Sequence, residues 1–199
     1  MKNQRKSNYG LGEFLLNIVA LIYTKIFWKN ARLIRLPIRV RGKSCMKFGK
    51  GLTTGYSCRI EMNGEKIQDK LVIGENCIIG DYIHLVANYK VRIGDNVLMA
   101  SRIFISDSNH GNYSGDIDHD NPNLEPNKRH IEYKEVVIGD NVWIGENVSI
   151  LAGCHIGNGC IIGANTVVTK DVPENCIIVG NPAKIIKKYD KSKKKWVKI

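Results

Sequence analysis

Residues 138–173 read IGDNVWIGENVSILAGCHIGNGCIIGANTVVTKDVP, and this stretch decides the fold. An aliphatic residue returns every six positions without a slip, and a small or β-branched residue stands four places after each one. The aliphatic positions are Ile138, Ile144, Ile150, Ile156, Ile162 and Val168, and the later positions are Val142, Val148, Cys154, Cys160, Thr166 and Val172. A fixed period over six consecutive blocks is the signature of a repeat architecture.

The repeat has a simple physical interpretation. Each hexapeptide supplies one short strand and one turn, and three of them close a triangular coil. The aliphatic residue and the residue four places later face the narrow axis, while Gly, Asn and Asp suit the tight turns. Stacked coils bury one continuous core. We therefore expect an all-β solenoid, a left-handed parallel β-helix with an N-terminal α-helix and a short C-terminal extension.

The same period occurs earlier in the chain, in Ile73, Ile79 and Leu85, then in Ile93, Met99 and Ile105, and more weakly in Phe48, Thr54 and Ile60. We assign residues 38–183 to the β-helix. Four of the six cysteines, Cys58, Cys77, Cys154 and Cys160, fall on the inward fourth position. We expect them to be small core residues and not disulfide partners or metal ligands.

The regularity stops after Ile105 and resumes at Ile138. The segment between is polar and rich in Gly, Pro, Asn and Asp, and a loop of this length in a compact domain is usually functional or disordered. Because it opens on a DSNH cluster at the end of a coil, we expect the inserted loop, residues 106–136, to be functional. It contains His110, His119 and His130.

The first 37 residues form a separate segment, with a helix expected over residues 11–29. Glu13, Asn17, Ala20 and Thr24 fall on one narrow stripe at helical spacing, and apolar residues cover much of the remaining surface. Two interpretations stay open. The helix packs on the first coil or on a neighbouring subunit, or it lies on an acidic membrane surface with the help of nearby Lys and Arg residues.

The chain carries 30 Lys and Arg against 19 Asp and Glu, a net charge of +11. Such an excess favours anionic partners, and much of it lies in the first forty residues and in the basic tail, residues 184–199. No nucleic-acid-binding pattern accompanies it, so we expect no nucleic-acid partner. Residues 14–28 are too short and too polar to span a bilayer, and no cleavage site follows them. We expect a cytoplasmic protein, with peripheral contact at the inner face of the membrane as an open alternative.

The run VVIGDNVWIGENVSILAGCHIGNGCIIGANTVVTKDVPENCIIVGNPAKII, residues 136–186, resembles the maltose and galactoside branch of hexapeptide-repeat O-acetyltransferases. ISDSNHG at 105–111, the Pro126-x-x-Arg129 motif and the KKY…W…I tail are most similar to bacterial lipopolysaccharide O-antigen O-acetyltransferases and their capsule relatives. RLIRLP at 32–37 fits that subgroup too, so the likeness covers nearly the whole chain.

The resemblance implies a homotrimer with active sites between subunits, acetyl-CoA as co-substrate and no metal. It places His110 at the position of the catalytic histidine and Trp143 at that of the aromatic residue lining the thioester channel. Ala164, Thr169 and Lys170 match positions along the pantetheine and nucleotide groove, and Lys184 and Lys187 match basic residues near the 3′-phosphate of CoA. On the acceptor side it suggests His84, Asn88, Asp107 and Arg129, although several relatives carry Asn where this chain has His84.

These residues fit direct acetyl transfer. A sugar hydroxyl is a poor nucleophile while protonated, and a neutral imidazole at His110 can take the proton as the oxygen attacks, an effect of about 10²–10⁴-fold. No serine or cysteine stands in a nucleophile motif such as GxSxG. The tetrahedral oxyanion needs a donor, and a backbone N–H near Ala100 or Ser101 is our expectation.

Two residues carry open alternatives. Asp107 either orients the imidazole or binds the sugar, or it caps the turn that leaves the coil. Arg129 either contacts an anionic sugar or pins the loop by a salt bridge.

Rival functions are weaker. A γ-type carbonic anhydrase shares such a prism but needs three histidines converging on zinc, and the close pair on neighbouring strands is lacking. A non-enzymatic scaffold has no use for the irregular loop. We expect the acceptor to be a sugar or glycolipid, an O-antigen or capsule precursor, with a free sugar or amino sugar as the alternative.

Overall fold

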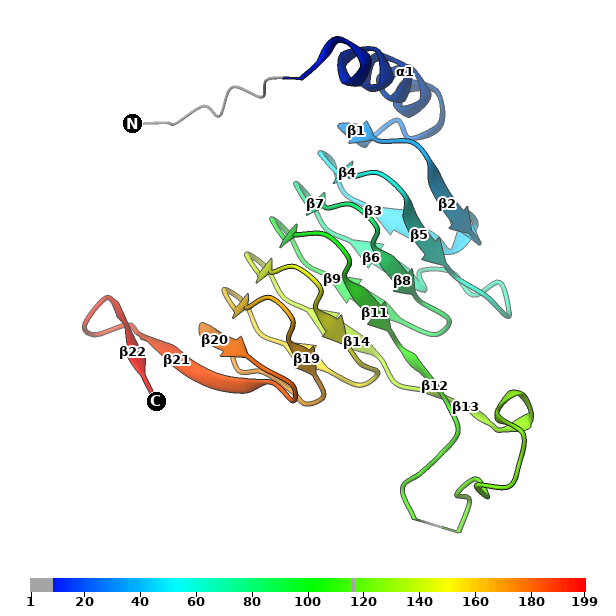
Figure 1. The fold of residues 1–199 in the computed structure, drawn as a ribbon, viewed down its shortest axis with the longest axis vertical. Helices are drawn as coiled ribbons and strands as arrows, with labels where there is room; N and C mark the ends of the chain where they lie inside the picture. Colours follow the sequence, from blue (N-terminus) through cyan, green and yellow to red (C-terminus); the bar gives the residue numbers. More distant parts are fainter. Residues whose placement is uncertain (1–8, 116) are drawn as a thin grey trace.

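The computed structural model, which describes residues 9–115 and 117–199, is a triangular prism of stacked coils with one helix across its N-terminal end (Figure 1). The predicted left-handed parallel β-helix with an N-terminal helix is confirmed. Residues 1–8 and 116, which belong to the predicted N-terminal segment and inserted loop, lie outside the described residues.

Three parallel sheets form the faces of the prism. Sheet A contains β1 (Leu33–Ile34), β4 (Thr53–Thr54), β7 (Ile78–Ile79), β10 (Leu98–Met99), β15 (Trp143–Ile144), β18 (Ile161–Ile162) and β20 (Cys176–Val179). Sheet B contains β2 (Ile38–Arg41), β5 (Cys58–Glu61), β8 (His84–Val86), β11 (Phe104–Ser106), β16 (Ser149–Ile150) and β19 (Val167–Val168). Sheet C contains β3 (Met46–Phe48), β6 (Leu71–Ile73), β9 (Val91–Ile93), β14 (Val136–Ile138) and β17 (His155–Ile156).

The core follows the six-residue period. Every aliphatic position and every fourth position from Ile138 to Val172 is buried, as predicted. The six cysteines are buried free thiols, and burial raises the pKa of Cys58 to about 11. These side chains fill one axial core that runs from the first coil to the last.

The turns explain why Asn recurs at the corners. Asn76, Asn96 and Asn141 adopt positive φ between sheets C and A, where Asn is favoured over most other non-Gly residues. Their amides form a ladder, with Asn76 Nδ2 3.5 Å from Asn96 Oδ1 and Asn96 Nδ2 3.3 Å from Asn141 Oδ1. The ladder ties one coil to the next.

Two additions depart from the prism (Figure 1). The inserted loop begins and ends in an antiparallel ribbon of β12 (Ser108–His110) and β13 (Ile131–Tyr133), and it contains a 3₁₀ turn at Pro126–Lys128. The basic tail is not irregular, because β21 (Lys184–Asp190) and β22 (Lys195–Lys198) pair antiparallel and extend sheet A beyond β20.

Helix α1 (Leu11–Phe27) caps the first coil through its polar stripe. Thr24 is buried, and its Oγ1 accepts a hydrogen bond from the Ile34 N–H at 2.8 Å and donates one to the Ala20 carbonyl at 2.6 Å. Asn17 Oδ1 accepts a bond from Arg35 Nε at 3.1 Å. Beyond the helix, Trp28 closes the axial core against Phe48, and a 3₁₀ turn follows at Lys43–Cys45.

The opposite face of α1 is apolar and uncovered. Ten large apolar side chains in the helix are 40–77% exposed, namely Leu11, Phe14, Leu15, Leu16, Ile18, Val19, Leu21, Ile22, Ile26 and Phe27. The polar stripe therefore faces the protein and the apolar surface faces outward, which inverts the usual amphipathic arrangement.

No helix among the described residues meets the length and hydropathy needed to cross a membrane.

Candidate active site

His110 lies at the end of β12, in the ribbon that leaves the prism at the edge where sheet B turns into sheet C. It stands opposite Ile131 of β13, and the Gly111 N–H donates to the His130 carbonyl at 2.7 Å. The imidazole is exposed and makes no hydrogen bond with the described residues. The loop predicted to be functional is thus built around the predicted base.

A hydrogen-bond chain behind His110 was not predicted. The Tyr113 hydroxyl donates to the His110 carbonyl at 2.5 Å and accepts a bond from Arg129 Nη1 at 2.7 Å. Arg129 also donates to the carbonyls of Leu124 at 2.9 Å and Pro122 at 3.0 Å. Gly111 has a φ of +112° and a Cβ there would meet the Tyr113 ring, so glycine is required beside the histidine.

These hydrogen bonds bear on the two roles predicted for Arg129. Its guanidinium pins the loop, as one alternative expected, and among the described residues its partners are carbonyl and hydroxyl oxygens and no carboxylate. The Pro-x-x-Arg motif was the available signal in the sequence. Tyr113 gave none, because an isolated loop tyrosine has no periodic or motif context.

Asp107 occupies the capping position and not a substrate-facing one. It is fully buried, and its carboxylate accepts backbone N–H bonds from Asn88 at 3.0 Å, Tyr89 at 2.7 Å and Lys90 at 2.6 Å. Burial raises the pKa of Asp107, and these N–H donors oppose the shift without cancelling it. The carboxylate therefore holds the turn before β9, as the capping alternative expected, and the substrate-binding role of Asp107 stays a prediction.

Asn88 is held in the same turn. Its Oδ1 accepts the Asn63 N–H at 2.9 Å, and its Nδ2 donates to Ser108 Oγ at 3.3 Å. The amide therefore joins the loop after β5 to the base of the ribbon. Asn88 lies next to β12, but its polar atoms are engaged within the protein.

His84 lies on the outer face of sheet B, next to Phe104 of the following strand, with ring centroids 5.4 Å apart. Its Nε2 is 3.2 Å from Glu61 Oε2. Glu61 is buried and also contacts Arg59 at 2.6 Å and Arg41 at 2.7 Å. Desolvation raises the pKa of Glu61, but the bonds from Arg59 and His84 and the charges of Arg59 and Arg41 outweigh it, so the net shift is downward.

Trp143 lies on a different face. It projects outward from sheet A and is 51% exposed, in register with Leu98, which is in turn in register with Ile78. Leu98 and Ile78 are also exposed. Side chains at the outward positions of the next two strands, Ile161 and Ile177, are half-buried. The indole is thus part of an apolar row along the prism.

The other residues predicted to bind the coenzyme lie on different parts of the prism. Thr169 and Lys170 follow β19 at the edge between sheets B and C, which also carries the ribbon. Ala164 follows β18 at the edge between sheets A and B, while Lys184 and Lys187 lie in β21 of sheet A. Within one chain, therefore, Trp143 and Ala164 do not share the edge of His110.

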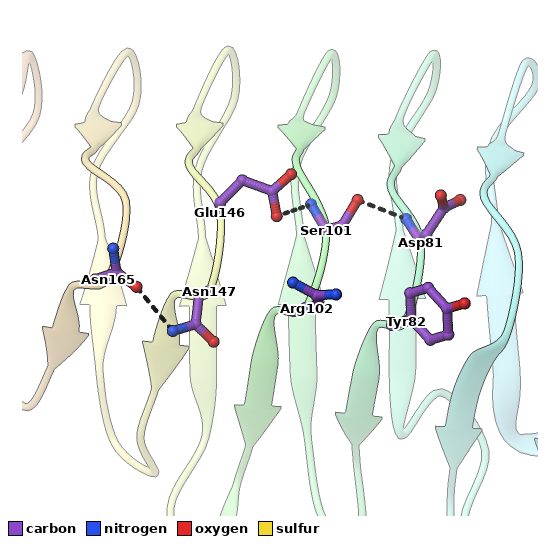
Figure 2. A pocket seen from close by; sticks show the side chains of 7 residues that line it. All are labelled: Asp81, Tyr82, Ser101, Arg102, Glu146, Asn147 and Asn165. Carbon is purple, nitrogen blue, oxygen red and sulfur yellow. Dashed lines mark hydrogen bonds between the residues drawn. The ribbon is translucent and has the colours of Figure 1, made fainter.

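A shallow groove runs along the edge between sheets A and B and is lined by Asp81, Tyr82, Ser101, Arg102, Glu146, Asn147 and Asn165 (Figure 2). Figure 2 shows Glu146 accepting the Ser101 N–H, at 3.1 Å, and Asn147 donating to Asn165, at 2.8 Å. The Ala100 N–H donates to the Ile144 carbonyl at 2.9 Å. Both N–H groups expected to serve as oxyanion donors are therefore paired within the described chain, and their role as donors stays a prediction.

Of the remaining histidines, His119 and His130 line one hollow of the inserted loop, and His155 lies elsewhere, in β17. His130 Nδ1 is 3.3 Å from Asp120 Oδ1 inside the loop, and His155 is exposed on sheet C. Within residues 9–115 and 117–199, no group of three or more His, Cys, Asp or Glu side chains is arranged to hold a metal ion.

Comparison with known proteins places these features in context. Residues 135–170 match the pattern described as bacterial transferase hexapeptide (six repeats). The chain is 40% identical over 190 residues to WbbJ of Escherichia coli K12, provisionally named as a lipopolysaccharide biosynthesis O-acetyl transferase, and the match covers 96% of this chain and 95% of that protein. It is 35% identical over 118 residues to the galactoside O-acetyltransferase of the same organism, covering 59% of this chain and 54% of that protein.

Solved structures share the architecture. The hexapeptide-repeat acetyltransferase VCA0836 of Vibrio cholerae superposes with a TM-score of 0.51 at 26% identity, covering 76% of this chain and 73% of that one. AntD of Bacillus cereus, an N-acyltransferase solved with coenzyme A and a dTDP-amino sugar, superposes with a TM-score of 0.58 at 19% identity, covering 86% and 89%. At that identity the second likeness concerns the fold alone.

Proposed function

Because this chain belongs to the hexapeptide-repeat acetyltransferase family, we propose that it acetylates a sugar hydroxyl of a bacterial surface glycan, an O-antigen or capsule precursor, with His110 as general base. The chain is an acetyl-CoA-dependent acetyltransferase that acts on sugars. The finer acceptor is supported by the 40% identity to WbbJ over nearly the full length of both chains. The observation that carries the base is an exposed His110 at the head of the functional loop.

The proposed reaction is a direct transfer. The His110 imidazole takes the proton of the sugar hydroxyl as its oxygen bonds to the thioester carbonyl carbon. The tetrahedral intermediate then collapses, the C–S bond breaks, and the CoA thiolate leaves and receives the proton from the imidazolium. Products are the acetyl ester and free CoA. Binding both substrates in one groove supplies much of the remaining acceleration.

The site is proposed to form between subunits of a homotrimer. His110 lies at the edge between sheets B and C, whereas Trp143 lies on sheet A. The exposed row of Ile78, Leu98 and Trp143 gives sheet A an apolar face that favours contact with another copy. A neighbour presenting this face to the ribbon edge would bring its Trp143 and Ala164 toward His110.

We place the bound coenzyme against residues from two parts of the prism, the edge between sheets B and C and strand β21 of sheet A. Thr169 and Lys170 are exposed at the edge of the ribbon, and Lys184 is exposed in β21. Lysines at the nucleotide end of the groove attract the phosphates of CoA. His84 and Arg59 offer polar contacts on sheet B for the acceptor, while the Asp107 carboxylate holds the turn before β9 and Arg129 holds the loop.

The proposed location is the cytoplasm, with a peripheral position on the inner face of the membrane for a lipid-linked acceptor. A free sugar is the alternative acceptor, favoured by the identity to the galactoside O-acetyltransferase.

The test is acetyl transfer by the purified chain to a panel of free sugars and membrane glycolipid extract, followed by mass spectrometry. His110→Ala is compared with His155→Ala, a matched change at an exposed histidine of sheet C. We expect His110→Ala to lower the rate about 10²–10⁴-fold while equilibrium binding of acetyl-CoA persists. We expect His155→Ala to behave as wild type.

The products discriminate the alternatives. An acetyl group released from the glycan by mild alkali is an ester, whereas an alkali-stable group indicates an amino-sugar acceptor. Equal activity of His110→Ala and wild type would refute the assignment of the base. Failure of the purified chain to bind acetyl-CoA would refute its assignment as an acetyltransferase.

A further inference from the structure

The outward face of α1 has an unusual composition for the end of a solenoid. Terminal caps of solenoids need a polar outer face to keep the end of the stack soluble. Here the polar stripe of Asn17 and Thr24 is turned onto the first coil, and the outward surface consists of large apolar side chains. We propose that this face of α1, with the basic residues around it, binds the surface of an anionic lipid bilayer, so that the prism stands on its N-terminal end.

The position of the charge supports an anionic partner at this end. Residues 9–73, which form α1 and the first two coils, hold 12 Lys and Arg against four Asp and Glu. Residues 74–199 hold 15 of each. Within that stretch, residues 74–183 hold seven Lys and Arg against 14 Asp and Glu, and the tail, residues 184–199, holds eight Lys against one Asp. Positive charge therefore gathers at both ends of the prism, and at the N-terminal end it accompanies the apolar face of α1. Apolar insertion beside basic residues is the combination that binds anionic membranes.

A groove beside the helix fits lipid chemistry as well. It runs between α1 and β1, with Phe14, Ile18, Leu21 and Leu33 as apolar walls and Arg32 and Arg35 at its margin. Arg35 is oriented by Asn17 and by the Thr54 carbonyl, 3.2 Å from its Nη1. Apolar walls beside guanidinium groups match an acyl chain and its phosphate.

A second copy of this chain is a poorer occupant. Two such ends facing each other would bring like charges together, which opposes association. In the proposed trimer, by contrast, three copies side by side would turn their helices toward the same plane, and simultaneous engagement would strengthen binding to a surface. The inference deepens the proposed peripheral location, but it does not depend on acetyl transfer.

The experiment is flotation of the full chain with vesicles of phosphatidylcholine alone and with a quarter phosphatidylglycerol. We expect co-flotation with the anionic vesicles and little with the neutral ones. Leu15→Ser/Ile22→Ser alters two exposed positions seven residues apart on one face of α1 and should abolish binding. The matched control is Ile67→Ser/Ile199→Ser, which removes two exposed isoleucines elsewhere and should bind as wild type.

A second pair of variants isolates the charge. Lys25→Glu/Lys29→Glu and Lys194→Glu/Lys198→Glu change net charge equally, the first at α1 and the second in the tail, and all four lysines are exposed. We expect the first to weaken vesicle binding by on the order of tenfold or more and the second to leave it nearly unchanged. Circular dichroism checks that every variant is folded.

Three outcomes would overturn the inference: no flotation with anionic vesicles, equal loss in the helix and control variants, or a change of oligomeric mass in Leu15→Ser/Ile22→Ser. The last would make the face an interface between copies. Acetyl transfer to a water-soluble acceptor is measured in parallel. Transfer without flotation refutes the membrane surface alone. Flotation without transfer to any acceptor, membrane glycolipid extract included, refutes the proposed acceptor chemistry alone.

Discussion

At the scale of single residues, the position of His110 depends on neighbours that do not contact the imidazole. The Tyr113 hydroxyl holds the His110 carbonyl, and Arg129 holds that hydroxyl. Gly111 provides the left-handed backbone that lets the tyrosine fold back over the strand end. A general base must stand within hydrogen-bond reach of the proton it removes, so a small displacement of the strand end is costly.

Tyr113→Phe tests this positioning role. The ring remains but the bond to the His110 carbonyl is lost, and we expect kcat to fall about tenfold with a smaller change in KM. Steady-state kinetics with acetyl-CoA and the identified acceptor measures both. Tyr133→Phe, an exposed tyrosine in β13 with no hydroxyl bond in the described structure, is the control and should keep kcat. A rise in KM with kcat unchanged would contradict a role of Tyr113 in positioning the base.

Glu61 provides a pH-dependent contribution to stability. Its pKa is lowered in the folded chain, so the folded state binds this proton more weakly than the unfolded state. The contribution is present above the unfolded-state pKa of about 4.3 and is lost as pH falls through the lowered value. We expect Glu61→Gln to lower the free energy of unfolding by about 1–3 kcal/mol at pH 7.

Urea unfolding of wild type and Glu61→Gln across acid pH measures this difference. The gap between the two proteins should narrow as the pH drops below about 4. A gap independent of pH would mean that packing, and not the charge of Glu61, causes the loss.

At the scale of elements, the strands of the coils were predictable and the additions were not. The period that runs through Ile138 to Val168 fixes both the strands and the inward side chains, because each coil repeats the same environment. The ribbon and the β21–β22 hairpin have no period, and their pairing depends on contacts between segments far apart in sequence. The stripe on α1 was visible, but only the structure shows that it faces the prism.

The cap interaction of α1 gives a prediction at this scale. Thr24→Val conserves shape but leaves the buried Ile34 N–H without an acceptor, and we expect a loss of about 1–3 kcal/mol in unfolding free energy. Chemical denaturation measures it. Thr24→Ser keeps the hydroxyl and should recover most of the loss. Equal losses in both variants would assign the effect to the methyl group.

The candidate site shows the same division between what sequence and structure provide. His110 could be placed from its DSNH motif, and Trp143 from its outward position in the repeat. The burial of Asp107 under three backbone donors could not be read from the sequence, because it depends on a turn one coil earlier. The paired N–H groups of Ala100 and Ser101 are likewise a property of stacking between coils.

At the scale of the whole molecule, the separation of His110 and Trp143 on one chain makes assembly a condition of activity in the proposed function. Leu98→Glu places a charge in the centre of the exposed row on sheet A, and we expect monomers without transfer activity. Light scattering coupled to size exclusion gives the mass. Val72→Glu puts the same charge on sheet C and should leave a trimer. An active monomer would refute a site shared between subunits.

The order of strands in sheet B also sets the distance, along the axis of the prism, between α1 and the ribbon that carries His110. Two strands lie between β2, beneath the helix, and β11, after which the ribbon that carries His110 begins, so three spacings of about 4.8 Å separate β2 from β11. With α1 resting on a bilayer, the thickness of the helix adds about 10 Å. In that arrangement the His110 imidazole would lie on the order of 20 Å from the lipid surface. With the proposed lipid-linked acceptor, the number of coils would then set how far along the glycan from its lipid anchor the acetylated sugar lies.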